Sequence, residues 1–194
     1  MQILLVSMIE GLNFGQDSAM RKLHITELNR KNTEEFHLAG KWPVRIILDN
    51  VRSLHNIGSV FRTSDAFLCE AIYLCGISAT PPNKEIHKSA LGAENSVYWE
   101  YFSSVKEAAL KAQCDGYKIV LIEQTDQSIP LDQWEESTEK IALVFGNEVS
   151  GVSDEVLDVA DAAVEIPQFG TKHSFNISVC AGIVLYQLFC LRTK

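Results

Sequence analysis

The chain has 194 residues, of which 46% are hydrophobic and 22% are charged. This composition is that of a single globular domain and excludes disordered and fibrous proteins, and a chain of this length buries a sizeable core without disulfides or metals. The net charge of −8 argues against a nonspecific nucleic-acid binder.

The start of the chain does not have the pattern of a signal peptide. Residues 3–9 are apolar, but no basic segment precedes them and no cleavage site follows closely. Met20 is a candidate natural start, which would make residues 1–19 a dispensable extension. Residues 20–41 are dense in charged and amide side chains and predict an exposed helical arm. We therefore divide the chain into an N-terminal extension, 1–41, and a main domain, 42–194.

Charge is distributed unevenly along the chain. Residues 20–62 hold eight Lys and Arg against four Asp and Glu, whereas the remainder is acidic. Any contact with a polyanion is expected through this front third, although a solvated helical arm explains the same charges.

From Val44 onward, short β-type runs alternate with segments of helical periodicity. Strands are predicted at 45–48, 71–74, 97–101, 117–122, 141–145 and 163–166. Helices are predicted at 56–67, 105–112, 154–160 and 175–191. This alternation indicates an α/β domain with a mainly parallel sheet flanked by helices.

The segment 175–191 is apolar nearly all the way round. It is too short and too interrupted by polar residues to span a membrane, so no membrane span is predicted. An apolar helix of this kind must be covered on both sides, and we predict a homodimer through it. Complete burial within one chain explains the pattern equally well.

Several common catalytic patterns are missing from the sequence. No Gly-x-Gly occurs, which removes the dinucleotide fingerprint. Gly146 and Gly151 have P-loop spacing, but Val152 and Ser153 follow where Lys and Ser or Thr are needed. No G-x-S-x-G elbow is present, and the histidines have no i,i+4 partner or nearby Cys, so no hydrolase triad or metal site is expected.

Three polar clusters follow predicted strands, where open α/β sheets usually bind ligands. The first, 49–62, contains Asn56 as a candidate cap of the next helix and Arg62 within its amphipathic part. Burying an Arg is costly unless it meets a carboxylate or phosphate, so Arg62 is a candidate phosphate ligand. A structural ion pair with Asp65 or Glu148 is the alternative.

The second cluster follows the predicted strand 141–145, and the third follows the predicted strand 163–166. Residues 145–151 form a glycine-bracketed turn whose backbone allows close approach of a ligand and whose Glu148 offers a carboxylate. Residues 166–178 place polar side chains directly before the apolar helix, where Ser174 or Asn176 is a candidate cap.

In this order the clusters resemble the three motifs of the SpoU (TrmH-like) family of SPOUT RNA methyltransferases. The matching patterns are N-x-G-x-x-x-R at 56–62, F-G-N-E-x-x-G at 145–151 and I-P-x-x-G-x-x-x-S-x-N-x-S at 166–178. The resemblance covers about residues 44–191. It implies the SPOUT fold, a parallel α/β sheet whose C-terminal segment forms a deep trefoil knot, in an obligate dimer.

The resemblance also implies an activity: transfer of the methyl group of S-adenosyl-L-methionine to a ribose 2′-hydroxyl of RNA, either tRNA or rRNA. Phe175 stands where Leu is usual in the family and keeps the position apolar. The positions implied to bind the cofactor are Gln124, Thr125, Gly146, Asn147, Gly151, Ile166, Gln168, Ser174 and Phe175.

Arg62 matches the family's proposed activator of the hydroxyl, with Asn56, Glu148, Ser174 and Asn176 as its supporting residues. A free guanidinium has a pKa above 12, so a role as base needs a strong perturbation. A grip on the adjacent phosphate is the alternative. We predict that Arg52, His55, Arg62, Lys172 and His173 contact the RNA.

Two other functions remain open at this point. One is a catalytically weak RNA-binding or ribosome-assembly factor that keeps the cofactor pocket, and the other is a nucleotide-binding regulator that does not bind RNA. The five cysteines include no C-x-x-C pair and are typical of reduced core thiols, which favours a cytoplasmic protein.

Overall fold

The computed structural model describes residues 20–135 and 140–193, and the predictions for residues 1–19 lie outside them. The chain divides into two compact units, 1–31 and 32–194. In the first unit the described residues form one 3₁₀ helix, Ile25–Leu28, with an ion pair of 2.7 Å between Arg21 and Glu27. This helix ends at Asn29, which has a left-handed backbone with φ of 47°.

The second unit begins with helix α1, Thr33–Leu38, which Asn32 caps. Phe36 on this helix is only 4% exposed and belongs to the main core. Residues 20–41 contain two short helices and are exposed except for Phe36, Ala39 and Lys41, which agrees with the predicted exposed helical arm apart from these three residues. The functional boundary between an extension 1–41 and a domain 42–194 stays a prediction.

The core of the second unit is a parallel sheet of seven strands within the described residues, in the order β3-β2-β1-β6-β4-β7-β5. The sheet order places β6 between β1 and β4, although about ninety residues separate β1 from β6 in the chain. The strands are β1 Trp42–Asp49, β2 Cys69–Cys75, β3 Tyr98–Phe102, β4 Lys118–Ile122, β5 Ile129–Pro130, β6 Ile141–Phe145 and β7 Ala162–Glu165.

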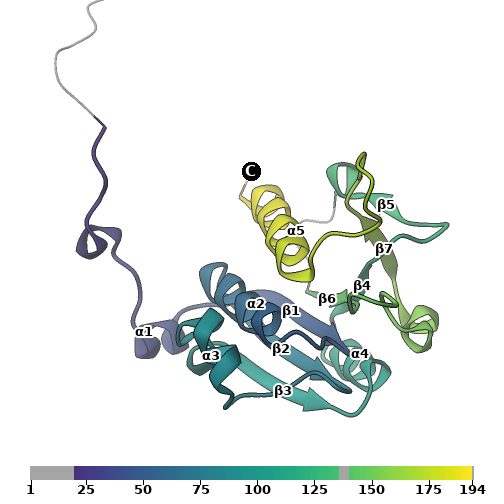
Figure 1. Ribbon diagram of the computed structural model, residues 1–194, viewed down its shortest axis with the longest axis horizontal. Helices are drawn as coiled ribbons and strands as arrows, with labels where there is room; N and C mark the ends of the chain where they lie inside the picture. The colour runs from purple at the N-terminus through teal and green to yellow at the C-terminus, as the bar shows by residue number, and fades with distance from the viewer. Residues whose placement is uncertain (1–19, 136–139, 194) are drawn as a thin grey trace, which may run out of the picture. The chain divides into compact units, whose positions relative to one another are not determined.

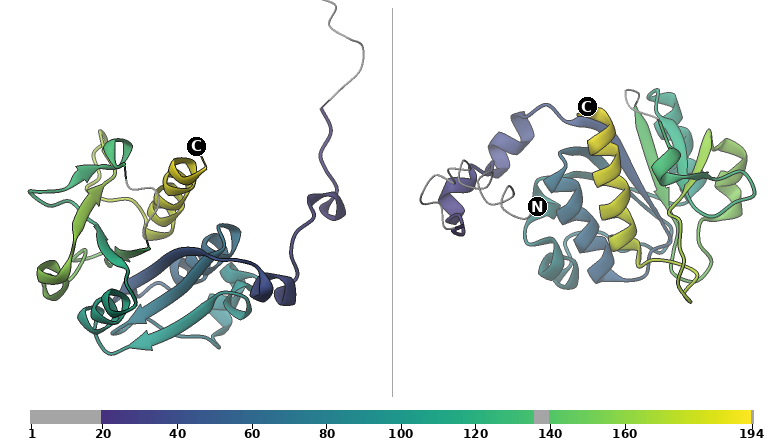
Figure 2. Two further views of the ribbon diagram at one scale, coloured as in Figure 1. Left: turned by 180° about the vertical axis from the view of Figure 1, so that it is seen from behind. Right: turned by 90° about the horizontal axis from the view of Figure 1, so that it is seen from above.

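Helices cover both faces of this sheet (Figures 1 and 2). On one face lie α2 Leu54–Ala66, α3 Lys84–Ala90 and α5 Ile177–Arg192, with α2 packed against both of the others. On the other face lie α4 Val105–Cys114 and a 3₁₀ helix, Asp154–Val159. Strand alternation accounts for the two layers, because Ile46 joins the first core and Ile47 the second.

The six predicted strands all form, within about three residues at each end. Four elements were not predicted: α3, which Asn83 caps, the short edge strand β5, and two 3₁₀ helices, Ala93–Asn95 and Leu131–Gln133. β5 contains Pro130, which lacks a backbone donor and suits an edge position.

A charged network lies at the amino ends of the strands. Arg45 of β1 donates to Glu70 and to Asp115, at 2.7 and 2.5 Å, and its guanidinium lies 4.0 Å from the ring centroid of Tyr117. Lys111 also donates to Asp115 at 2.6 Å. This network joins β1 to β2 and to the end of α4, at the opposite ends of the strands from the polar clusters.

The five cysteines are free, as predicted, but only Cys69 and Cys75 are fully buried. Among the residues that the structure describes, no helix is both long and apolar enough to cross a membrane.

Candidate functional site

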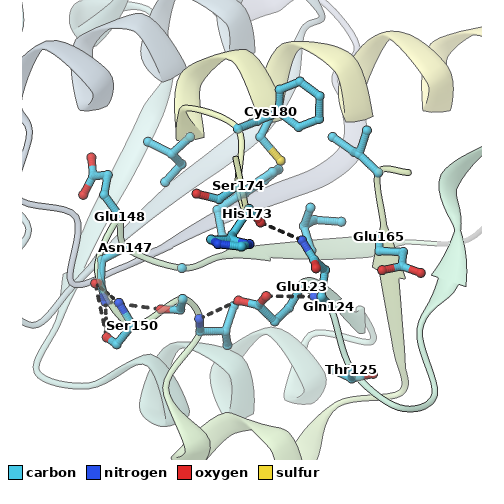
Figure 3. Close-up of a pocket in the computed structure, with 18 of the residues that line it drawn as sticks. Glu123, Gln124, Thr125, Asn147, Glu148, Ser150, Glu165, His173, Ser174 and Cys180 are labelled. Atoms are coloured by element: carbon cyan, nitrogen blue, oxygen red, sulfur yellow. Dashed lines mark hydrogen bonds between the residues drawn. The ribbon is translucent and has the colours of Figure 1, made fainter. Parts of the chain in front are cut away.

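A cavity of about 760 Å³ opens at the carboxyl ends of β4, β6 and β7 (Figure 3). Its walls are the residues after β4, the turn after β6 and the loop between β7 and α5. Parallel strands bring these three segments to one edge of the sheet. Every residue predicted to bind the cofactor lines this cavity, namely Gln124, Thr125, Gly146, Asn147, Gly151, Ile166, Gln168, Ser174 and Phe175.

The turn after β6 is closed by its own backbone. Asn147 and Gly151 exchange two backbone hydrogen bonds of 3.0 and 3.1 Å. A Cβ atom on Gly146 would lie 2.0 Å from the carbonyl carbon of Gly151, and Gly151 itself has φ of 69°. Glycine is therefore required at both positions for the turn to close at the floor of the cavity.

Glu123 is a pocket residue that the sequence motifs did not reveal. Its carboxylate accepts hydrogen bonds from the backbone N–H groups of Gln124, at 2.8 Å, and Val152, at 3.0 Å (Figure 3). It thereby ties the end of β4 to the turn after β6. Its only sequence signal was its place directly after a predicted strand, which does not single out one carboxylate.

The loop from β7 to α5 is anchored at two points. The side-chain amide of Gln124 donates to the backbone oxygen of His173 at 2.9 Å. Asn176 caps α5, since its side-chain oxygen accepts from the backbone N–H of Ser178 at 3.0 Å, so the predicted cap at Asn176 is confirmed.

Asn56 connects the three polar clusters. Its side-chain nitrogen donates to the Glu148 carboxylate at 2.7 Å, and its side-chain oxygen accepts from the Asn176 amide at 3.1 Å. Asn56 lies within the first turn of α2, which Ser53 caps with a hydrogen bond of 3.2 Å. The prediction that Asn56 caps this helix is therefore wrong, because its side chain is engaged with the other two clusters.

Arg62 lies apart from this network. It is exposed, it does not line the cavity, and it has no hydrogen bond or ion pair with any described residue. The alternative of an ion pair with Asp65 or Glu148 is wrong, since Asp65 accepts from Ser96 and Glu148 accepts from Asn56. One chain therefore brings together Asn56, Glu148 and Asn176, with Ser174 in the cavity wall, but does not bring Arg62 to them.

The predicted RNA-contacting residues divide into two groups. Lys172 and His173 are exposed and line the cavity. Arg52 and His55 are exposed beside the start of α2 and do not line it, and His55 lies 3.6 Å from the Glu85 carboxylate.

Cys180 of α5 also lines the cavity (Figure 3). Burial, with a further contribution from the nearby Glu123 charge, raises the pKa of its thiol to about 12. The thiol therefore stays neutral near pH 7 and does not supply a nucleophilic thiolate. In the described part of the chain, no group of three His, Cys, Asp or Glu side chains is arranged to hold a metal ion.

Comparison with known proteins gives the family. Residues 43–186 match the model of the SpoU rRNA Methylase family. A curated tRNA (guanosine(18)-2′-O)-methyltransferase from Aquifex aeolicus is 31% identical over 73% of this chain and 66% of its own length.

Solved structures are similar in fold. The A. aeolicus TrmH/SpoU tRNA modifying enzyme matches with a TM-score of 0.73 and 27% identity, over 83% of this chain and 82% of that one. An AdoMet-bound rRNA methyltransferase from Sinorhizobium meliloti matches with a TM-score of 0.70 and 25% identity, over 77% and 56%. Because the family model spans all three polar clusters, the chain belongs to the SpoU rRNA methylase family.

Proposed function

We propose that this chain, an S-adenosylmethionine-dependent RNA 2′-O-methyltransferase of the SpoU family, binds its cofactor in the cavity at the carboxyl edge of the sheet. The acceptor is a ribose 2′-hydroxyl of tRNA or rRNA, held beside Asn56, Glu148 and Asn176. One observation carries this proposal: the nine residues expected at the cofactor line a single cavity, and Glu148 of its rim is bonded into the Asn56 network.

The cavity suits a nucleoside cofactor. Its volume falls within the range of about 300–1,000 Å³ that is usual for small-molecule sites. Gly146 and Gly151 shape the turn at one wall of the cavity, and Ile122, Phe145 and Ile166 give an apolar wall. When bound, S-adenosylmethionine supplies an electrophilic methyl group on its sulfonium.

The residues around the cavity orient the acceptor. A ribose hydroxyl is a poor nucleophile, so it must be positioned in line and must lose its proton as the methyl group transfers. The Glu148 carboxylate lines the cavity, and the Asn56 amide that donates to it adds a second hydrogen-bonding group beside the place where the hydroxyl would enter. We assign Arg62 to the neighbouring phosphate and not to proton removal, because the planar guanidinium fork matches a phosphate with two hydrogen bonds.

Completion of this site by Arg62 requires a homodimer. Within one chain Arg62 is exposed on α2 and outside the cavity. The neighbouring α5 presents an uncovered apolar face, on which Val179 is 50%, Tyr186 61% and Phe189 37% exposed. A second copy that covers this face would bury it and bring a further α2 to the site.

We also propose that the chain forms the deep trefoil knot of SPOUT proteins. The insertion of β6 between β1 and β4 supports this, as does the return of α5 onto α2 after the loop from β7. Such a path is an exception to the general absence of knots in proteins.

RNA contact is assigned to Arg52, His55, Lys172 and His173, together with residues 1–41 as a candidate RNA-binding extension. In a chain of net charge −8, Arg52 and Lys172 supply positive charge, and Lys172 and His173 line the cavity. Replacement of all four side chains by Ala is expected to reduce the salt dependence of RNA binding, and an unchanged salt slope would contradict the assignment.

Location of the protein in the cytoplasm also stays a prediction.

Calorimetric titration with S-adenosylmethionine and S-adenosylhomocysteine tests the pocket, with ATP and NAD as controls. We expect micromolar binding of the first two, at about one site per chain, and no binding of the controls. Transfer of a labelled methyl group to unmodified tRNA and rRNA transcripts then separates the enzyme from a binding-only assembly factor. Absence of cofactor binding in folded protein would contradict the proposal.

A further inference from the structure

The loop between β7 and α5 carries an aromatic side chain that the cofactor site does not use. Phe169 is 98% exposed, and it is absent from the cavity lining, although its neighbour Gln168 is part of that lining. No ring contact joins it to another aromatic side chain in the described residues. The fold therefore gains no packing from a phenyl group at this position.

The loop holds Phe169 close to the mouth of the cavity. Ile166 and Gln168 line the cavity on one side of it, and Lys172 to Phe175 line it on the other. Hydrogen bonds fix the far end of the loop, from Gln124 to the backbone of His173 and from Asn176 to Asn56. An exposed ring thus lies on a loop whose neighbouring residues line the cavity, where we propose that the acceptor ribose enters.

The surroundings of Phe169 suit a nucleic acid. Lys172 and His173 follow on the same loop, both are exposed, and neither makes an ion pair with a described residue. Val149, on the facing turn that lines the cavity, is 80% exposed and adds a second uncovered apolar side chain at the rim. A cation that contacts phosphate beside an exposed ring that stacks on a base is the usual combination for single-stranded RNA.

We infer that Phe169 is a base-stacking residue that holds an unpaired nucleotide of the substrate RNA beside the methylated ribose. The inference rests on the proposed RNA methyltransferase function and deepens it. Recognition by stacking requires an unpaired base, so the substrate class is RNA whose target lies in a loop, bulge or single strand. Paired A-form RNA does not offer a base face to this side chain.

The inference is tested with Phe169→Ala and Phe169→Tyr in the full chain. We expect Phe169→Ala to raise the KM for an unmodified tRNA transcript by on the order of tenfold, the size of one base-stacking contact. Phe169→Tyr is expected to restore the KM, because it keeps the ring. The Kd for S-adenosylmethionine is expected to be unchanged in both, since Phe169 does not line the cavity.

A spectroscopic reading does not depend on turnover. In Phe169→Trp the added indole is expected to be quenched by a short RNA stem–loop and much less by the same sequence in a full duplex, after subtraction of the wild-type signal. The control is Leu110→Trp on α4, which is 43% exposed on the opposite face of the sheet.

These readings separate the inference from the proposed function. Quenching of Phe169→Trp and weaker RNA binding by Phe169→Ala, without methyl transfer by the wild type, would support the stacking role and contradict the proposed methyltransferase activity. Methyl transfer by the wild type with an unchanged KM in Phe169→Ala would overturn the stacking role alone. A change in oligomeric state of Phe169→Ala by light scattering, with unchanged RNA binding, would assign the ring to a second copy of the chain and overturn the inference.

Discussion

The cofactor cavity and the outer face formed by α2 and α5 differ in how far a single chain completes them. Around the cavity, the turn 146–151, Glu123 and the loop before α5 are fixed by hydrogen bonds to one another. On the outer face, Arg62 is unpaired among the described residues and Tyr186 is 61% exposed. One chain therefore completes the cavity that we propose for the cofactor, whereas positioning of the acceptor is expected to need RNA and a second copy.

The strongest test of the cavity is Gly146→Ala. The new Cβ would lie 2.0 Å from the backbone of Gly151, so the turn cannot keep its shape. We expect the Kd for S-adenosylmethionine to rise by on the order of 100-fold, since overpacking a rigid site costs about 1–3 kcal/mol or more. Titration calorimetry measures this Kd.

The matched control is Gly40→Ala, where a Cβ meets nothing within 4 Å. Equal binding of S-adenosylmethionine by both variants would show that the turn does not form the cofactor site.

Arg62→Ala tests the outer face formed by α2 and α5. We expect the methylation rate to fall by on the order of 10²–10³, as for removal of a group that stabilises a transition state, with no change in cofactor Kd. Arg62→Lys is expected to recover little, because an ammonium cannot replace a bidentate guanidinium. Single-turnover methyl transfer measures both variants. Near-normal turnover by the Lys variant would contradict the phosphate-gripping role.

Tyr186→Glu tests whether a second copy covers α5. A charge in the middle of an apolar interface is expected to weaken dimerisation by on the order of tenfold or more, measured by analytical ultracentrifugation. Tyr98→Glu, at the edge of the sheet and 62% exposed, is the matched control. If the two variants have the same oligomeric state, α5 is not the interface.

Asp115→Asn changes the charged network at the amino ends of the strands, which belongs neither to the cavity nor to the outer face of α2 and α5. Hydrogen bonds from Lys111 and Arg45 lower the pKa of Asp115 from 3.8 to about 2. Stability from this carboxylate is therefore fully present above pH 4 and is lost as the pH falls towards 2. We expect a small loss of stability at neutral pH, and a shallower acid-unfolding curve for the variant by circular dichroism, with no change in cofactor binding. A curve identical to that of the wild type would contradict a contribution from Asp115.

Features that depend on local sequence patterns could be predicted from the sequence. The strands were predictable because apolar β-type runs, such as 141–145, mark buried parallel strands whatever lies beside them. The cavity residues followed from motifs that sit directly after these strands. Glu123 was missed because its partners, Gln124 and Val152, are backbone groups that carry no sequence signal.

Two other features depended on contacts that spacing does not encode. Asn56 was expected to cap α2, but Ser53 does so and leaves Asn56 to bridge Glu148 and Asn176. Helix α3 was not predicted because its seven residues contribute only Ile86 and Ala90 to the core, which is too few to show a helical period.

The bridge made by Asn56 has a consequence for the order of events during synthesis. Its two partners follow it by 92 and 120 residues, and the second of them starts α5. A ribosome-bound chain that has not yet released α5 therefore lacks the bridge, even when β1 and α2 have already emerged. If Asn56, Glu148 and Asn176 position the acceptor as we propose, competence for methylation is expected only once α5 is free to fold.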